Sequence, residues 1–181
     1  DRILVSVDGT TQEVYEQYRI NGKLEKVKAG ISNLVKAKAE LKSKTPHIIM
    51  QFLVVKPNEH QIEEVKALGK QLGVDEVALK TAQIYDYENG SDLIPTIEEY
   101  SRYKKLDNGK FAIKNKMKNQ CWKLWHSNVV TWDGQITPCC FDKDADYSMG
   151  NLNDTCLDEI WSNKKYDKFR TQILKDRKSI D

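Results

Sequence analysis

The sequence predicts an α/β fold in which a small parallel sheet precedes a separate module that contains every cysteine. In the first 81 residues, short apolar segments typical of strands alternate with amphipathic segments typical of helices. This order favours parallel strands joined by right-handed crossovers. Further along, all four tryptophans and all four cysteines fall between residues 121 and 161. Such an abrupt change of composition indicates a second structural unit.

The first predicted strand covers residues 3–8, where apolar and polar side chains alternate. Under the two-residue period of a strand, Ser6 and Asp8 share one face near its carboxyl end. Thr10 and Glu13 then have the spacing of a capping box. A short helix is therefore expected directly after the strand.

Two longer helices and two more strands follow. Apolar residues at three- and four-residue spacing predict helices over residues 24–41 and 59–72, the second ending at Gly73 in a left-handed cap. Residues 47–55 are a nearly continuous apolar run, typical of a strand covered on both faces, and residues 75–80 predict a third strand. Because three strands are too few to close a barrel, we expect them to be part of one.

The periodic pattern fades between residues 82 and 120, where turn-forming residues separate short polar segments. We therefore expect three parts: a barrel-like unit over residues 1–81, a connection over residues 82–120 and a cysteine-containing module over residues 121–181.

Composition excludes several classes of protein. The 29 lysines and arginines nearly balance the 27 acidic residues, so no global field attracts nucleic acid or an anionic membrane. No apolar stretch approaches the roughly 20 residues of a membrane helix. The chain begins within a predicted strand, without an initiator Met or signal peptide. We therefore expect a piece of a longer protein, with no nucleic-acid or membrane partner.

The most specific pattern lies around the cysteines. Strand-like segments flank Asp133 and Gly134, a dipeptide that favours a hairpin turn. The hairpin is expected to carry Cys121 and Cys139 toward each other. Two thiolates make half of a four-coordinate site, and sulfur ligands suit zinc or an iron–sulfur cluster.

This pattern resembles the start of a SPASM domain, or of the shorter twitch domain. The resemblance rests on Cys121, Gly134 and Cys139 at their spacing, followed by residues 150–151 and 158–161. Such domains are auxiliary iron–sulfur modules of radical S-adenosylmethionine enzymes. The three predicted strands, in their order before the module, resemble the second half of that superfamily's partial barrel.

The resemblance implies a fold and an activity. The fold is α/β, with half of an incomplete parallel (β/α)6 barrel followed by a small α+β module with a β-hairpin. The activity is that of a radical S-adenosylmethionine oxidoreductase or maturase. Such an enzyme cleaves S-adenosylmethionine at a 4Fe–4S cluster to a 5′-deoxyadenosyl radical and modifies a peptide, protein or small metabolite. The family also implies an electron donor such as flavodoxin or ferredoxin, and a reducing, cytoplasmic location.

Two motifs of the family are absent from this sequence. The C-x3-C-x2-C motif that binds the catalytic cluster does not occur, nor does the later C-x2-C that completes an auxiliary cluster. The expectation is therefore that this chain alone is inactive and that it supplies an incomplete set of ligands to an auxiliary 4Fe–4S cluster. The catalytic 4Fe–4S cluster would belong to the full-length parent.

The resemblance also places candidate site residues. Ser6 and Asp8 match the strand end where the family contacts S-adenosylmethionine. Gln51 and Asn58, on or just after the next strand, are further cofactor-binding candidates, and Lys80 on the third strand is a secondary one. A strand-end polar pair and a buried amide are the structural alternatives.

Among the cysteines, Cys121 and Cys139 match the first two ligands of the auxiliary cluster, and Cys140 is a third candidate. Two other hypotheses stay open. The first is a non-catalytic zinc or substrate-recognition module in which these three cysteines and Cys156 form a closed site. The second is an α/β binding domain whose cysteines are merely buried.

Other conspicuous residues have structural interpretations. Cys156 is expected to be buried in the first turn of a short helix that begins with a capping box of Thr155 and Asp158. The tryptophans are expected in the core of the small module. The lysine-rich segment over residues 164–178 is expected to form a solvated face.

Overall fold

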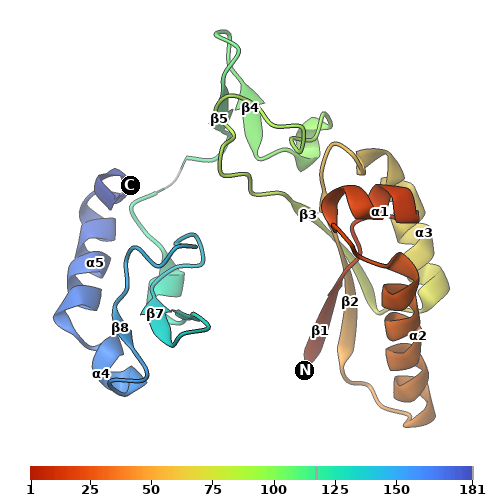
Figure 1. Ribbon diagram of the computed structural model, residues 1–181, viewed down its shortest axis with the longest axis horizontal. Helices are drawn as coiled ribbons and strands as arrows, with labels where there is room; N and C mark the ends of the chain where they lie inside the picture. Colours follow the sequence, from red (N-terminus) through yellow and green to blue (C-terminus); the bar gives the residue numbers. More distant parts are fainter. Residues whose placement is uncertain (117, 181) are drawn as a thin grey trace. The chain divides into compact units, whose positions relative to one another are not determined.

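The structure of the protein is a computed structural model that describes residues 1–116 and 118–180 (Figure 1). It divides into two units, residues 1–115 and residues 116–181. Among the described helices, none is both long enough and apolar enough to cross a membrane.

A three-stranded parallel sheet forms the centre of the first unit. Its strands β1 (Arg2–Ser6), β2 (His47–Val54) and β3 (Glu76–Thr81) lie in the order β1-β2-β3. Their register sets Ser6 beside Gln51. Both strand pairs are parallel, which confirms the prediction. Helices connect each strand to the next.

The helices of this unit cover one face of the sheet (Figure 1). They are α1 (Gln12–Tyr18), α2 (Leu24–Glu40) and α3 (Ile62–Leu72), with a 3-10 turn at Glu59–Gln61 before α3. As predicted, α3 ends at Gly73 in the left-handed conformation, with φ at 74°.

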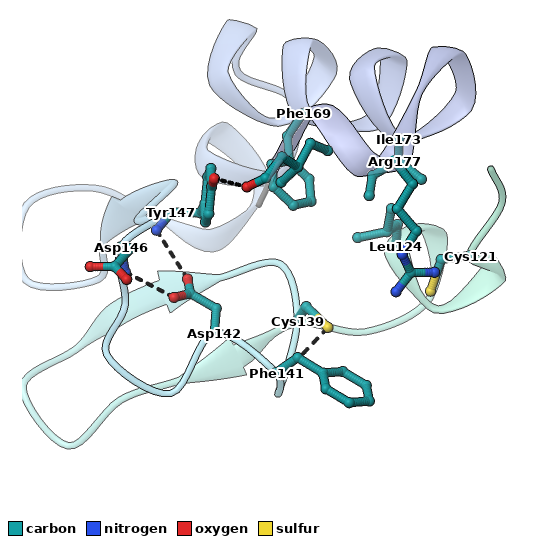
Figure 2. Close-up of a pocket in the computed structure, with 11 residues that line it drawn as sticks. Cys121, Leu124, Cys139, Phe141, Asp142, Asp146, Tyr147, Phe169, Ile173 and Arg177 are labelled. Carbon is teal, nitrogen blue, oxygen red and sulfur yellow. Dashed lines mark hydrogen bonds between the residues drawn. The ribbon is translucent and has the colours of Figure 1, made fainter. Parts of the chain in front are cut away.

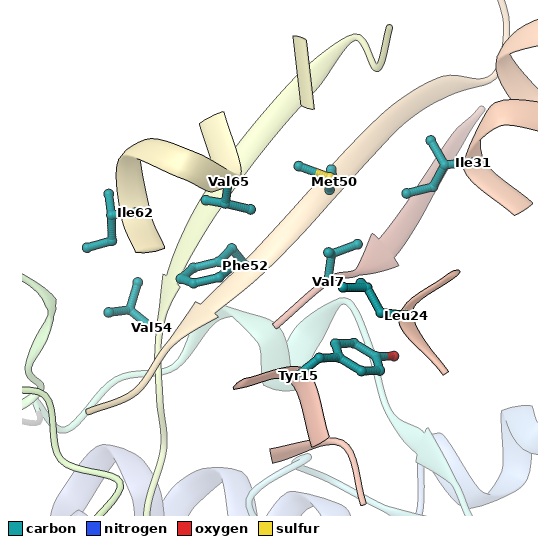
Figure 3. Packing of buried hydrophobic residues seen from close by; sticks show 9 residues of the cluster. All are labelled: Val7, Tyr15, Leu24, Ile31, Met50, Phe52, Val54, Ile62 and Val65. Carbon is teal, nitrogen blue, oxygen red and sulfur yellow. The ribbon is translucent and has the colours of Figure 1, made fainter. Parts of the chain in front are cut away.

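Buried apolar side chains from the strands and helices meet on the helix-covered face of the sheet (Figure 3). This core consists of Val7, Tyr15, Leu24, Ile31, Met50, Phe52, Val54, Ile62 and Val65. The opposite face is only partly covered: Leu4 is 57% exposed, and Gln51 and Leu53 are half-buried. In β2 itself no residue is exposed, and Ile49 on this opposite face is buried, so the second strand is covered fully on the helix side and partly on the other.

The start of α1 differs from the prediction by one residue. Thr11, not Thr10, is the N-cap, and its hydroxyl accepts a hydrogen bond from the Val14 N–H (3.4 Å). The Thr10 hydroxyl instead donates to the Glu64 carboxylate (2.6 Å). This contact spans 54 residues, so local spacing could not reveal it.

The segment after β3 contains a hairpin that sequence analysis did not predict. After the 3-10 turn η2 (Glu98–Tyr100), strand β4 (Tyr103–Lys105) pairs antiparallel with β5 (Phe111–Ile113). Gly109 supplies the positive φ of the turn, at 81°. The strands are three residues long, too short for a periodic pattern to stand out.

The second unit combines a small antiparallel sheet with helices. Its elements in chain order are η3 (Trp122–Trp125), β6 (Val129–Val130), β7 (Gln135–Thr137), β8 (Gly150–Asn151), α4 (Leu157–Trp161), α5 (Lys164–Lys175) and η4 (Arg177–Ile180). The hairpin prediction is confirmed, because β6 and β7 pair antiparallel and Gly134 has a φ of 85°. The described chain thus mixes helices and strands as predicted, with a parallel sheet in the first unit and a small antiparallel sheet in the second.

The core of this unit differs from the prediction. It is built from Leu124, Ile136, Met149, Ile160, Tyr166, Phe169, Ile173 and Ile180. Trp132 is 99% exposed and Trp122 is 70% exposed, while Trp161 packs at the edge of the core. The expectation that the tryptophans fill the core is therefore wrong for most of them, because α5 supplies the aromatic side chains instead.

Candidate metal centre

Cys121 and Cys139 line one cavity of about 580 Å³ within the second unit (Figure 2). Leu124, Phe169 and Ile173 form part of its apolar lining. The cavity thus presents two sulfur atoms next to an apolar surface, a setting that suits a metal or cluster ligated by thiolates.

Local structure places each cysteine. Cys121 directly precedes η3, and its carbonyl accepts a hydrogen bond from the Leu124 N–H (3.2 Å), the first bond of that turn. Cys139 follows β7 by two residues. Its carbonyl accepts bonds from the Asp142 N–H (3.2 Å) and from the buried Thr137 hydroxyl (3.5 Å). Both main-chain positions are thereby fixed at the edge of the cavity.

The surroundings of the Cys139 thiol change its acidity. Burial raises the pKa of the Cys139 thiol above its ordinary value. The Phe141 N–H donates to the sulfur (3.5 Å) and opposes this effect more weakly. Near neutral pH the side chain is therefore a protonated thiol, and a metal must displace its proton in order to bind.

The other two cysteines lie elsewhere. Cys140 and Cys156 are exposed, and neither is among the residues that line the cavity. The expectation that Cys156 is buried is wrong: α4 begins at Leu157, so Cys156 is the residue before the first turn. The Thr155 hydroxyl donates to the Glu159 carboxylate, and no side chain caps α4.

The donor set fits part of a cluster site. Cys121 and Cys139 offer two thiolates to one space, which is half of a tetrahedral set. Asp142 also lines the cavity, but its carboxylate accepts the N–H groups of Asp146 (2.9 Å) and Tyr147 (3.0 Å). In the described part of the chain, no three histidine, cysteine or acidic side chains converge as a metal site.

The cofactor-binding candidates of the first unit fall into two pairs. Ser6 and Gln51 are side by side in the register of β1 and β2, on the face that the helices leave open. Within the described residues, neither side chain forms a hydrogen bond. Lys80 is exposed at the end of β3.

Asp8 and Asn58 instead bind the protein itself. The buried Asp8 carboxylate accepts hydrogen bonds from the Leu53 N–H (2.8 Å) and from Arg19 Nε (2.6 Å). Asn58 Oδ1 accepts from the Val55 N–H (2.8 Å), and Nδ2 donates to the carbonyls of Leu53 (2.9 Å) and Asp8 (3.0 Å). This network fixes the carboxyl ends of β1 and β2.

Sequence reasoning missed the positively charged group at the cavity. Arg177 lines it together with the two cysteines, although the lysine-rich segment that contains it was expected to be solvated. Nothing in the local sequence marks Arg177 out in this segment, because its position at the cavity depends on how η4 packs.

Comparisons with known proteins agree with the predicted resemblance. Residues 121–180 match the family described as SPASM, an iron–sulfur cluster-binding domain. The tungsten-containing aldehyde ferredoxin oxidoreductase cofactor-modifying protein of Pyrococcus furiosus is 28% identical to this chain over 77% of the chain and 46% of that protein. The chain thus spans about half the length of this curated relative.

A crystal structure of BtrN in an open conformation aligns with 99% of this chain and 88% of that one, at 14% identity and a TM-score of 0.34. A score this low does not establish a shared fold. The family match stands independently of it, and it covers residues 121–180, the last third of the chain.

Proposed function

We propose that this chain is part of a radical S-adenosylmethionine enzyme, in which Cys121 and Cys139 bind an auxiliary 4Fe–4S cluster. The observation that carries the proposal is the placement of these two side chains on one cavity inside the matched SPASM domain. Cys139 follows the hairpin of β6 and β7, and Cys121 directly precedes the turn η3.

The bound cluster would position substrate or carry an electron. Residues of the cavity would contribute to its binding in two ways. Cys139 releases its proton on binding, and the apolar side chains of Leu124 and Phe169 limit the access of water. The Cys140 side chain is not part of the cavity lining. Cys140 would act as a third ligand only if the loop after Cys139 changed conformation and turned this side chain toward the cavity.

The first unit would supply part of the S-adenosylmethionine site, as the second half of a partial (β/α)6 barrel. Ser6 and Gln51 support this assignment, because they offer unpaired polar groups on the open face of the sheet. Asp8 and Asn58 would act mainly by holding the strand ends in place. Ligands of parallel α/β folds bind at these strand ends.

The substrate would be a peptide, protein or small molecule. The name of the Pyrococcus furiosus relative, a cofactor-modifying protein, favours a small molecule of the cofactor class. The full-length protein would also hold the catalytic 4Fe–4S cluster and accept electrons from a flavodoxin or ferredoxin, in the cytoplasm. A closed zinc site gains no support, since Cys140 and Cys156 are exposed away from the cavity.

The test is the formation of 5′-deoxyadenosine from S-adenosylmethionine by the anaerobically prepared full-length protein with a chemical reductant. The proposal expects this product in the wild type. It also expects the product in a Cys121→Ala, Cys139→Ala double variant, which retains the separate catalytic cluster but loses turnover of substrate. Absence of 5′-deoxyadenosine from a wild type loaded with iron and sulfide would refute the enzyme assignment.

A further inference from the structure

A positively charged side chain shares the cavity of the two cysteines. The Arg177 side chain extends from the start of η4 toward Cys121 and Cys139, and all three line the same space (Figure 2). Arg177 is half-buried, unlike its exposed neighbour Lys178. A guanidinium is charged at every pH at which the protein is folded.

Hydrogen bonds hold the main chain of Arg177 next to the cysteines. Asn119, two residues before Cys121, accepts the Arg177 N–H on Oδ1 (3.1 Å) and donates through Nδ2 to the Lys175 carbonyl (2.8 Å). The segment that leads into Cys121 and the segment that carries Arg177 are thereby joined directly.

The far end of η4 is fastened as well. The Tyr147 hydroxyl donates to the Ile180 carbonyl, and Gln172 Nε2 donates to the Ser179 carbonyl (3.0 Å). Ile180 itself is part of the buried core of the unit. The position of Arg177 at the cavity is therefore built by several contacts on both sides of the residue.

Among the residues that the structure describes, none forms an ion pair that neutralises the charge of Arg177. Asp142 and Asp146 line the same cavity, but no carboxylate of the described residues lies within 4.0 Å of the guanidinium nitrogens. The Asp142 carboxylate is occupied by two main-chain N–H groups. Arg177 is thus the one described cationic side chain in the lining, and its field acts on whatever the cysteines hold.

We propose that Arg177 sets the reduction potential of the cluster bound at Cys121 and Cys139, by stabilising its reduced form. This inference rests on the proposed function. One-electron reduction adds a negative charge to a cluster that already carries thiolate ligands. A fixed positive charge in a partly apolar cavity favours that added charge more than the oxidised state. Arg177 is a positioning residue in this role, since it acts through the cluster.

The experiment is a redox titration of the anaerobically prepared full-length protein, in which the cysteines of the catalytic cluster are replaced by alanine. Dithionite supplies the electrons, and the reduced cluster is followed by electron paramagnetic resonance. In Arg177→Gln, the ratio of reduced to oxidised cluster at a fixed potential is expected to fall about tenfold, a shift of about 59 mV to more negative potential.

Three variants make the result specific. Arg177→Lys keeps the charge and is expected to stay near the wild-type potential. Lys178→Gln removes a charge from the adjacent exposed position and is expected to leave the potential unchanged. If Arg177→Gln fails to fold, Arg177→Met keeps the apolar stem without the charge and is expected to show the same negative shift.

The outcomes separate the inference from its premise. An unchanged potential in Arg177→Gln or Arg177→Met, with the cluster intact, would overturn the role of Arg177 and leave the cluster assignment standing. An equal shift in Lys178→Gln would overturn it as well, because the effect would then be one of general surface charge. A wild type without a cluster at these cysteines would overturn the proposed function itself.

Discussion

At the scale of single residues, Cys139 must lose a proton before it can bind a metal. Cys139 is partly buried, and burial raises the pKa of its thiol. Near neutral pH, its thiolate is therefore favoured only when a nearby positive charge compensates the charge of the sulfur. Iron in a metal site or cluster provides that compensation. Burial therefore keeps the Cys139 thiol protonated until a positively charged iron binds.

This acidity is directly measurable. In a variant that keeps only Cys139, the rate of alkylation by iodoacetamide is expected to rise with pH around a midpoint above the ordinary cysteine value of 9.0. The same chain unfolded in guanidinium chloride is the control and should titrate at the ordinary value. Identical midpoints in the folded and unfolded chains would show that burial does not perturb Cys139.

The same shift has a consequence for stability. The folded pKa of Cys139 lies above the unfolded one, so the folded chain retains the proton longer as pH rises. The contribution of Cys139 to stability is therefore fully present below the unfolded pKa and is lost as pH rises through the folded one. Comparing wild type with Cys139→Ser by urea unfolding at successive pH values would reveal this loss in the wild type alone.

Asn58 illustrates a residue whose structural role can be separated from a cofactor role. Replacement by alanine leaves the Val55 N–H and the Leu53 and Asp8 carbonyls without their side-chain partner. Unpaired buried groups cost about 1–3 kcal/mol each, and we expect Asn58→Ala to lower the free energy of unfolding by about 2 kcal/mol or more. His60→Ala, at a nearby exposed position, is the control. Unchanged stability with weakened S-adenosylmethionine binding would assign Asn58 to the cofactor instead.

At the scale of elements, close contact between α3 and the sheet depends on Gly69. A Cβ at this position would lie 2.2 Å from Val77 Cγ2 and 3.0 Å from Met50 Cε. The branched side chain of Val77 is stiff and cannot move aside without changing rotamer. The absence of a side chain at Gly69 therefore sets how closely the helix approaches the strands.

We accordingly expect Gly69→Ala to destabilise the protein by about 1–3 kcal/mol through overpacking. Gly30→Ala is the matched control, because Gly30 lies within α2 and a Cβ there meets no atom within 4 Å. That change is expected to stabilise by about 0.5–1 kcal/mol, since alanine loses less backbone entropy in a helix. Chemical denaturation of both variants checks the pair, and an equal effect of the two substitutions would contradict the packing account.

The sequence could predict the elements with a long apolar period, and the hairpin that the Asp133–Gly134 turn marks. The helix expected over residues 24–41 is α2 (Leu24–Glu40), because local spacing alone defines its buried face. The hairpin of β4 and β5 was missed because its three-residue strands show no periodic pattern. The cap of α1 was misplaced by one residue because Thr10 and Thr11 are neighbours and either could be the cap. Arg177 was missed because its surroundings come from distant segments.

At the scale of the molecule, the chain joins a parallel α/β unit to a unit that matches the SPASM family. The spacing of Cys121, Gly134 and Cys139 identified that domain because hairpin turn and ligand positions are tied to one another in sequence. The cofactor-binding candidates were harder to judge. Asp8 and Asn58 are residues that a strand end uses for its own hydrogen bonds as readily as for a ligand.

The central claim is that Cys121 and Cys139 bind iron and sulfide. The most direct measurement is the iron, acid-labile sulfide and zinc content of the anaerobically prepared full-length protein. The wild type is compared with a double variant that carries Cys121→Ala and Cys139→Ala, and Cys156→Ala is the matched control. We predict that the double variant loses iron and sulfide equal to one cluster, whereas Cys156→Ala keeps the wild-type content. Zinc in place of iron at these cysteines, or the same iron and sulfide in the double variant, would contradict the account.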